Sequence, residues 1–174
     1  MKSLRLLLLT TAALFTFVLP PLAPAADVSI TAANFKPGAG AKFHTGIAGA
    51  TVTAGQPIAI SPSTGRFVLA VATDANLCQV IGVASHAAIS GQPLAVVWYA
   101  DNMTLGATLS MTNPVYVLSG TAGGIAPSAD LSAGGLYPSV FIIATSSTPG
   151  AATTTTCQLR APAFCGSSVS VVTP

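Results

Sequence analysis

The 174-residue chain has very few charged side chains and no glutamate. Charged residues make up 6% of the sequence, where a typical globular domain has about 25%. Because the only carboxylates are four aspartates, the paired acids of a glycosidase are not expected. Nothing in the sequence resembles a phosphate-binding surface, so we predict no binding to nucleic acid.

The chain also lacks the sequence motifs of common enzymes. Its only histidines are His44 and His86, and no Gly-x-Ser-x-Gly motif is present. No His-x-x-x-His or Cys-x-x-Cys spacing suits zinc, and the glycine-rich run 120–124 lacks the Lys-Ser/Thr of a phosphate loop. We therefore predict that the protein is not an enzyme and that it uses no cofactor and no metal. An exported hydrolase remains a third, weaker hypothesis.

The first 25 residues have the order of a secretory signal peptide. Lys2 and Arg5 precede an apolar run over residues 6–19, and residues 23–25 give the Ala-Pro-Ala of a cleavage site. The run is short for a membrane span. This leader predicts a secreted or periplasmic protein. The alternatives are an uncleaved leader, which would be the chain's only contact with a membrane, and a start codon assigned upstream of the true one.

After residue 25 the formal charges balance at zero. The remaining basic residues are Lys36, Lys42, Arg66 and Arg160, and the acids are Asp27, Asp74, Asp101 and Asp130. A neutral surface rich in small residues suits packing against another protein.

Three cysteines are present. In an exported protein, Cys157 and Cys165 could close a short loop by a disulfide. The alternative is that all three are free. Cys78 lies in a strand-like run and is expected in the core.

Short apolar runs between Gly, Pro, Asn and Ser favour strands, and no 11-residue window has helical periodicity. We predict an all-β fold, a small barrel or sandwich, over residues 26–147, and a separate Thr-rich segment over 148–174. The strongest strand covers Leu94 to Tyr99. Alternation places Trp98 and Tyr99 on opposite faces, so one of them is a candidate interface residue.

A repeated strand unit covers about residues 49–85 and 106–145. Gly-Ala-Thr recurs with an offset of 106 − 49 = 57, and the following proline has the same offset, 114 − 57 = 57. The apolar return strands align Val83 with Ile143, an offset of 143 − 83 = 60. The repeat predicts that each unit supplies half of the fold, with Gly49/Gly106 and Pro57/Pro114 as its anchors.

The order of several short motifs resembles small structural proteins of tailed bacteriophages and prophages, of the capsid decoration or cement type. Related strand units occur in phage tail-fibre modules. The motifs lie within residues 28–34, 46–57, 81–84, 91–96, 105–109, 116–119 and 123–127. The apparent signal peptide and the Thr-rich, Cys-containing end depart from this pattern.

The resemblance implies a β-rich protein on the virion surface that binds the major capsid protein, often as a trimer, without catalysis or a cofactor. A free N-terminal arm carrying Val28, Ile30 and Phe35 could add a strand to a neighbour. The alternative function is an exported surface or adhesive module that binds glycans or proteins outside the cell, which the leader and a Cys157–Cys165 bridge would favour.

Overall fold

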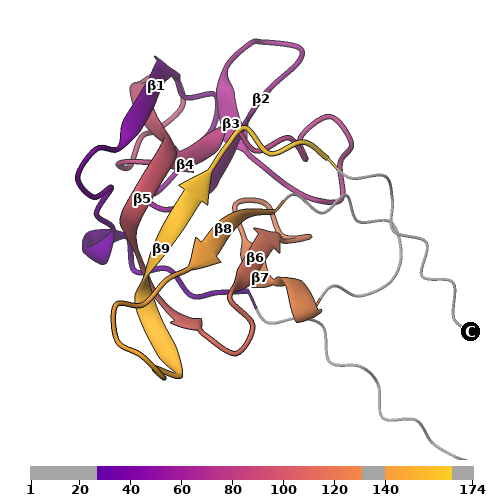
Figure 1. Ribbon diagram of the computed structural model, residues 1–174. Coiled ribbons are helices and arrows are strands. Elements are labelled where there is room, and N and C mark those ends of the chain that lie inside the picture. The colour runs from indigo at the N-terminus through magenta and orange to yellow at the C-terminus, as the bar shows by residue number, and fades with distance from the viewer. Residues whose placement is uncertain (1–26, 131–139, 166–174) are drawn as a thin grey trace, which may run out of the picture.

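The computed structural model describes residues 27–130 and 140–165. The expected leader at residues 1–25 and the C-terminal residues 166–174 lie outside this described part. The fold is all-β and is built from two related strand units, as the sequence predicts, and its sheet curls into a half-barrel (Figure 1). Within the described residues, no helix is long and apolar enough to cross a membrane.

Nine antiparallel strands form one sheet. They are β1 (Lys42–Ile47), β2 (Pro57–Ile60), β3 (Phe67–Leu69), β4 (Gly82–Ala84), β5 (Pro93–Ser110), β6 (Val115–Leu118), β7 (Ile125–Pro127), β8 (Val140–Ala144) and β9 (Thr153–Arg160). Two single 3₁₀ turns, Ala32–Asn34 and Ser128–Asp130, complete the described elements.

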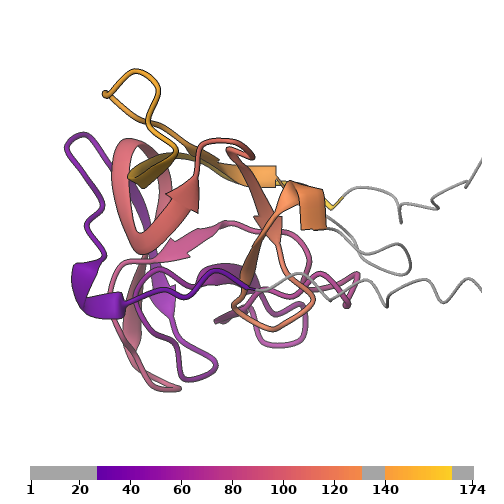
Figure 2. The same cartoon turned by 90° about the horizontal axis from the view of Figure 1, so that it is seen from below.

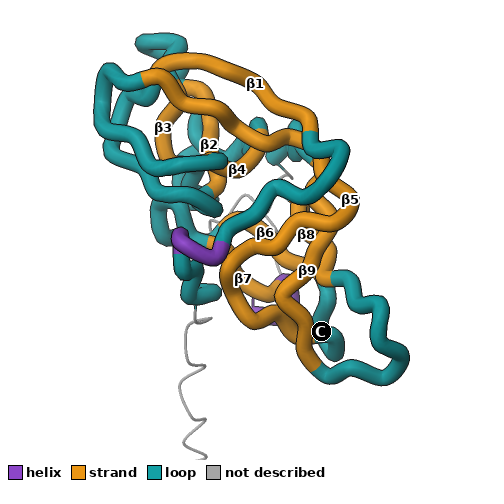
Figure 3. Tube along the Cα trace, turned by 90° about the vertical axis from the view of Figure 1, so that its left-hand side faces the viewer, coloured by secondary structure: helices purple, strands orange, loops and turns teal. Residues whose placement is uncertain are grey.

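The strand order shows the repeat directly. It runs β3-β2-β4-β5 in the first unit and continues β9-β8-β6-β7 in the second. In each unit the first strand lies between the second and the third, and the fourth strand joins the two units. Figure 3 shows the strands of the first unit at one end and those of the second at the other, with β5 extending between them.

The proline anchors of the repeat hold matching places at the starts of β2 and β6, but the glycine anchors do not hold matching places. Pro57 opens β2 and Pro114 directly precedes β6, where a missing N–H is tolerated. Gly49, however, follows β1, whereas Gly106 lies inside β5. The predicted alignment of the return strands is also wrong by one residue. Ile58 and Val115 correspond to each other in the two units, and they pair with Gly82 and Ile143. The offset of the return strands is therefore 143 − 82 = 61 and not 60.

The 18-residue strand β5 is the central strand of the fold. Val97 pairs with both Phe43 of β1 and Val83 of β4, so β1 and β4 lie on opposite edges of β5. Farther along, Tyr99 pairs with both Lys42 of β1 and Arg160 of β9. The chain that leads into β1 therefore follows one edge of β5, and β4 and β9 share the other edge.

The N-terminal arm, residues 27–36, is docked on its own chain and is not a free strand. The Val28 N–H donates to the Ile125 carbonyl at 2.7 Å, and the Thr31 N–H donates to the Gly106 carbonyl at 2.8 Å. Val28 and Ile30 pack against the core, and Phe35 is buried in it. The prediction of a free, partner-binding arm is therefore wrong in this structure, because the arm is bonded to its own chain and its apolar side chains pack in the core.

Two apolar clusters fill the fold. The smaller one lies within the first unit and consists of Ala48, Val52, Ile58, Phe67, Ala84, Ala88, Leu94 and Val96. The larger one joins the units and includes Val83, Val97, Met103, Leu105, Tyr116, Phe141 and Leu159. Adjacent residues Val96 and Val97 belong to different clusters, because alternate side chains of β5 point to opposite faces of the sheet.

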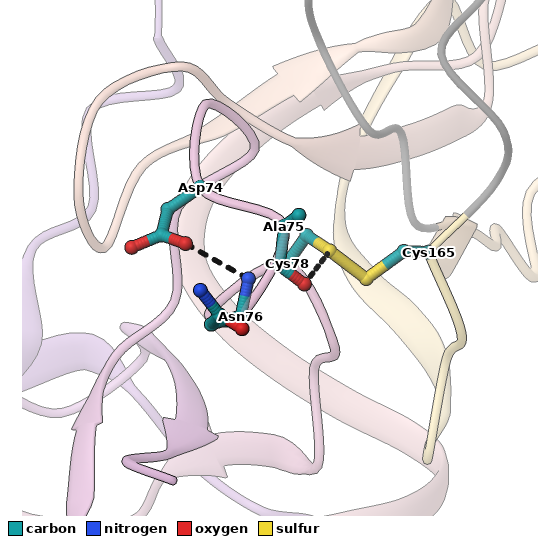
Figure 4. The surroundings of a disulfide bond; sticks show 5 residues. All are labelled: Asp74, Ala75, Asn76, Cys78 and Cys165. Carbon is teal, nitrogen blue, oxygen red and sulfur yellow. Dashed lines mark hydrogen bonds between the residues drawn. A yellow bond between two sulfur atoms is a disulfide. The ribbon is translucent and has the colours of Figure 1, made fainter. Parts of the chain in front are cut away.

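The disulfide joins Cys78 to Cys165, so the predicted Cys157–Cys165 pair is wrong (Figure 4). Cys157 points into the core from β9 and is free. The chain after β9 instead runs beside the residues before β4, where Val80 and Ala163 exchange two main-chain hydrogen bonds of 3.1 and 2.8 Å. Two positions farther, this pairing brings Cys165 next to Cys78.

The Thr-rich segment is part of the sheet as far as Arg160. The sequence predicts a segment separate from the β domain. Its strand β9 instead lies between β5 and β8, where Cys157 and Leu159 face the core. The hairpin that leads from β8 into β9 projects from the body of the protein (Figure 2).

Candidate interaction surface

An aromatic and cationic cluster lies where β1, β5 and β9 meet. We call it the aromatic corner and define it by Lys42, His44, Trp98, Tyr99 and Arg160. The rings of His44 and Trp98 are stacked, with centroids 5.4 Å apart and an interplanar angle of 19°. The rings of Trp98 and Tyr99 meet edge to face at 6.1 Å. Both candidate interface aromatics thus belong to one cluster, and both are half-buried.

A β-bulge explains why consecutive residues of β5 meet here. Lys42 pairs with Tyr99 and Phe43 pairs with Val97, so Trp98 is an extra residue without a partner of its own on β1. Such a bulge re-aims side chains that regular alternation would separate. The prediction that Trp98 and Tyr99 lie on opposite faces is therefore wrong, since their rings contact each other.

Two cations lie over the half-buried rings of Trp98 and Tyr99. The Lys42 Nζ lies 5.6 Å from the Trp98 ring centroid and 5.3 Å from that of Tyr99. The Arg160 Cζ lies 4.5 Å from the Tyr99 centroid. These distances fall within the roughly 6 Å range of cation–π attraction. Tyr99 is therefore held between two cations that come from different strands.

Asp101 fixes Arg160 and Tyr99 in this arrangement. The Arg160 Nη2 donates to Asp101 Oδ1 at 2.6 Å, and the Tyr99 hydroxyl donates to Asp101 Oδ2 at 3.0 Å. The Arg160 Nη1 also donates to the Ala100 carbonyl at 3.1 Å. The hydrogen bond from Arg160, followed by that from Tyr99, lowers the pKa of Asp101 below its ordinary value.

An apolar hollow of about 350 Å³ lies beside the corner, at the seam between β1 and β3. Directly after β1, Ala48 bridges to Phe67 of β3. Beyond that bridge the hollow is lined by His44, Thr45, Ile60, Phe67, Gln79, Ile81 and Pro162. His44 thus contributes both to the aromatic corner and to the wall of this hollow.

The strand β1 forms an exposed edge next to the hollow. Among the described strands it pairs with β5 alone. Phe43 is 47% exposed and Ile47 is 42% exposed, and both lie on this edge. An exposed edge with apolar side chains is a template for contact with another chain.

His86 and Cys157 have structural roles. His86 accepts the Ala95 N–H at Nε2, 3.2 Å away, and its Nδ1 lies 3.0 Å from the Ala87 carbonyl. Burial raises the pKa of the Cys157 thiol to about 12. Across residues 27–130 and 140–165, no three His, Cys, Asp or Glu side chains gather as metal ligands would.

The sequence indicated only part of this surface. Trp98 and Tyr99 were identified from one strong strand, but Lys42, His44 and Arg160 were not assigned to it. Lys42 and His44 are two positions apart on β1, so their shared face follows from strand periodicity once β1 is recognised. Arg160 comes from a distant strand, and no local pattern connects it with Tyr99.

No family model matches the chain, and no curated protein matches its sequence.

Proposed function

We propose that the chain is a virion structural protein that decorates and stabilises a capsid by protein–protein contacts, without catalysis or a cofactor. The observation that supports this most is the gathering of Trp98, Tyr99 and Arg160 beside an exposed apolar edge. These three residue types are the ones enriched at the energetic centres of protein interfaces. The resemblance of the sequence to decoration proteins supports the same role.

The proposed mechanism relies on many weak contacts acting together. One copy would place the aromatic corner and the edge of β1 against the major capsid protein. Linking several binding units raises the total affinity without any new kind of contact. A trimer of the chain, which the resemblance implies, would present three such surfaces. Capsid attachment would then depend on β1 and β5, and not on the docked N-terminal arm.

A second candidate function is an exported surface or adhesive module that binds glycans or proteins. The Cys78–Cys165 disulfide favours it, because structural disulfides form mainly in oxidising compartments. Cell fractionation separates the two functions. A periplasmic or secreted product without its leader would support the adhesive module, whereas a cytoplasmic, full-length product would support the virion role.

The experiment that tests capsid binding compares two pairs of exposed apolar residues. The variant Phe43→Ser/Ile47→Ser alters the edge of β1, and the matched control Val140→Ser/Ile143→Ser alters exposed residues of β8. Each protein is mixed with bare capsids and sedimented, and capsid heat resistance is measured. We expect the wild-type and control proteins to bind and to protect, and the β1 variant to lose both effects.

Two results would contradict the proposal. One is a wild-type protein that neither sediments with capsids nor raises their heat resistance. The other is equal loss in the β1 and β8 variants, which would show that β1 is not the contact surface.

A further inference from the structure

A polar hollow of about 460 Å³ lies where the N-terminal arm crosses the second half of β5. Its side chains carry hydroxyl, amide and ammonium groups. The arm contributes Ser29, Thr31, Asn34 and Lys36, and β5 contributes Thr104 and Thr108. Thr155 of β9 closes the hollow on another side.

The polarity of this hollow follows from the alternation of β5. Leu105 and Leu109 are buried in the core, whereas Thr104 and Thr108 lie on the outer face of the same strand. Between the two threonines, Gly106 leaves room for the arm to approach. The outer face of β5 is therefore the floor of the hollow, and the arm forms its wall.

Main-chain hydrogen bonds hold the wall in place. Lys36 and Thr104 exchange two of them, each 2.9 Å long, and the Thr31 N–H donates to the Gly106 carbonyl. Gly106 has a positive φ of 81°, and a Cβ atom there would lie 2.5 Å from the Thr31 carbonyl oxygen. Phe35 is buried beneath the arm. The hollow is thus formed before any ligand arrives, which lowers the entropic cost of binding.

The polar side chains of the hollow are not engaged within the protein. No side-chain hydrogen bond or ion pair joins Asn34, Lys36 or the hydroxyl residues to any other residue of the described part. The aromatic corner differs, since Arg160, Tyr99 and Asp101 bind one another there. The donors and acceptors of the hollow are therefore free for a ligand.

We propose that this hollow binds a carbohydrate that carries a carboxylate. Hydroxyl and amide groups can donate to and accept from sugar hydroxyls. Among the described residues that line the hollow, Lys36 alone is charged, and its ammonium group pairs with a carboxylate. The volume lies within the range of small-molecule sites, about 300 to 1,000 Å³. The inference does not depend on the capsid role.

The test is an NMR titration of the mature, disulfide-bonded protein with trigalacturonate. Its fully methyl-esterified form is the matched ligand, because it keeps the ring hydroxyls and loses the charge. We expect amide shifts in residues 29–36 and 104–108, and binding of the ester that is weaker by about tenfold. Lys36→Met should weaken trigalacturonate binding by a similar factor, whereas Lys42→Met in the aromatic corner should not.

Three outcomes would overturn the proposal. The first is the absence of shifts at millimolar trigalacturonate. The second is a set of shifts outside the arm and β5. The third is displacement of trigalacturonate by inorganic phosphate at the same concentration, which would identify a site for small anions that does not recognise the sugar. Because Lys36 is exposed, its variant should have the unfolding midpoint of the wild type, so lost binding is not confused with lost folding.

Discussion

Cys78 and Cys165 lie across an antiparallel pair from each other, with their Cα atoms 5.5 Å apart. The hydrogen-bonded pair Val80–Ala163, two positions away, sets this register. The bond fastens the chain after β9 to the residues before β4, so it connects the end of the second unit to the first.

The disulfide should contribute much of the stability. It spans a sequence separation of 87 residues, and the chain-entropy model assigns a loop of that size about 4 to 5 kcal/mol. We expect Cys78→Ser/Cys165→Ser to lower the free energy of unfolding in urea by up to this amount. Reductant should destabilise the wild type similarly and leave the variant unchanged. A wild-type unfolding midpoint that is the same with and without reductant would contradict this prediction.

The thiol of Cys157 should be unreactive in the folded protein. Burial raises its pKa from 9.0 to about 12, so the thiolate that reacts with alkylating reagents is scarce at pH 8. We expect no labelling of the native protein and one label per chain in denaturant without reductant. Above pH 9 the unfolded chain ionises this thiol while the folded chain does not, so its contribution to stability should fall as the pH rises towards 12. Rapid native labelling at pH 8 would show that the thiol is accessible.

The carboxyl of Asp101 should titrate below its ordinary pKa of 3.8. Because Arg160 is the largest cause, Arg160→Gln should move this pKa back up, and Tyr99→Phe should move it less. Because this pKa is lowered, the ion pair of Asp101 and Arg160 stabilises the fold above pH 3.8. The stabilisation is lost as the pH falls through the pKa that Asp101 has in the folded protein. NMR titration of the Asp101 carboxyl measures both shifts. The side chains of Arg160 and Asp101 are largely exposed, so we expect Arg160→Gln to change the thermal stability little.

Gly106 should tolerate substitution less well than another glycine of similar conformation. Gly106 has φ +81° and Gly65 has φ +66°, but only the Cβ at Gly106 would clash, with the Thr31 carbonyl. Gly65→Ala should cost about 1 to 2 kcal/mol from backbone conformation alone. Gly106→Ala should cost more and should speed hydrogen exchange at the Thr31 amide. Equal costs would mean that the arm is not held at this point.

The sequence predicted the class of the fold because its signals are local. Short β-branched runs between glycine and proline identify strands, and the recurrence of Pro57 and Pro114 before equivalent strands identified two related units. The alignment of Gly49 with Gly106 failed for a physical reason. The tripeptide Gly-Ala-Thr suits a loop, as at Gly49, and it also suits the interior of a strand that another segment approaches closely, as at Gly106. The composition of the tripeptide does not distinguish these two cases.

Contacts between residues far apart in the chain could not be predicted from the sequence. The short spacing of Cys157 and Cys165 suggested a pair, but β9 is extended and carries the two apart, while Cys78 approaches only through the pairing of Val80 with Ala163. Trp98 and Tyr99 were placed by simple alternation, which a bulge interrupts. A bulge depends on the partner strand, and the sequence of β5 alone does not contain that information.

The docked arm has a consequence for how the chain is made. Val28 bonds to Ile125, which lies 125 − 28 = 97 positions later. At about 5 to 20 residues per second, synthesis of that stretch takes about 5 to 20 s. During this time Val28 has been made but its hydrogen-bond partner Ile125 has not. The arm is made before every strand of the described sheet, yet its first residues dock only after β7 has been made, and until then Val28 stays open to chaperones and to aggregation.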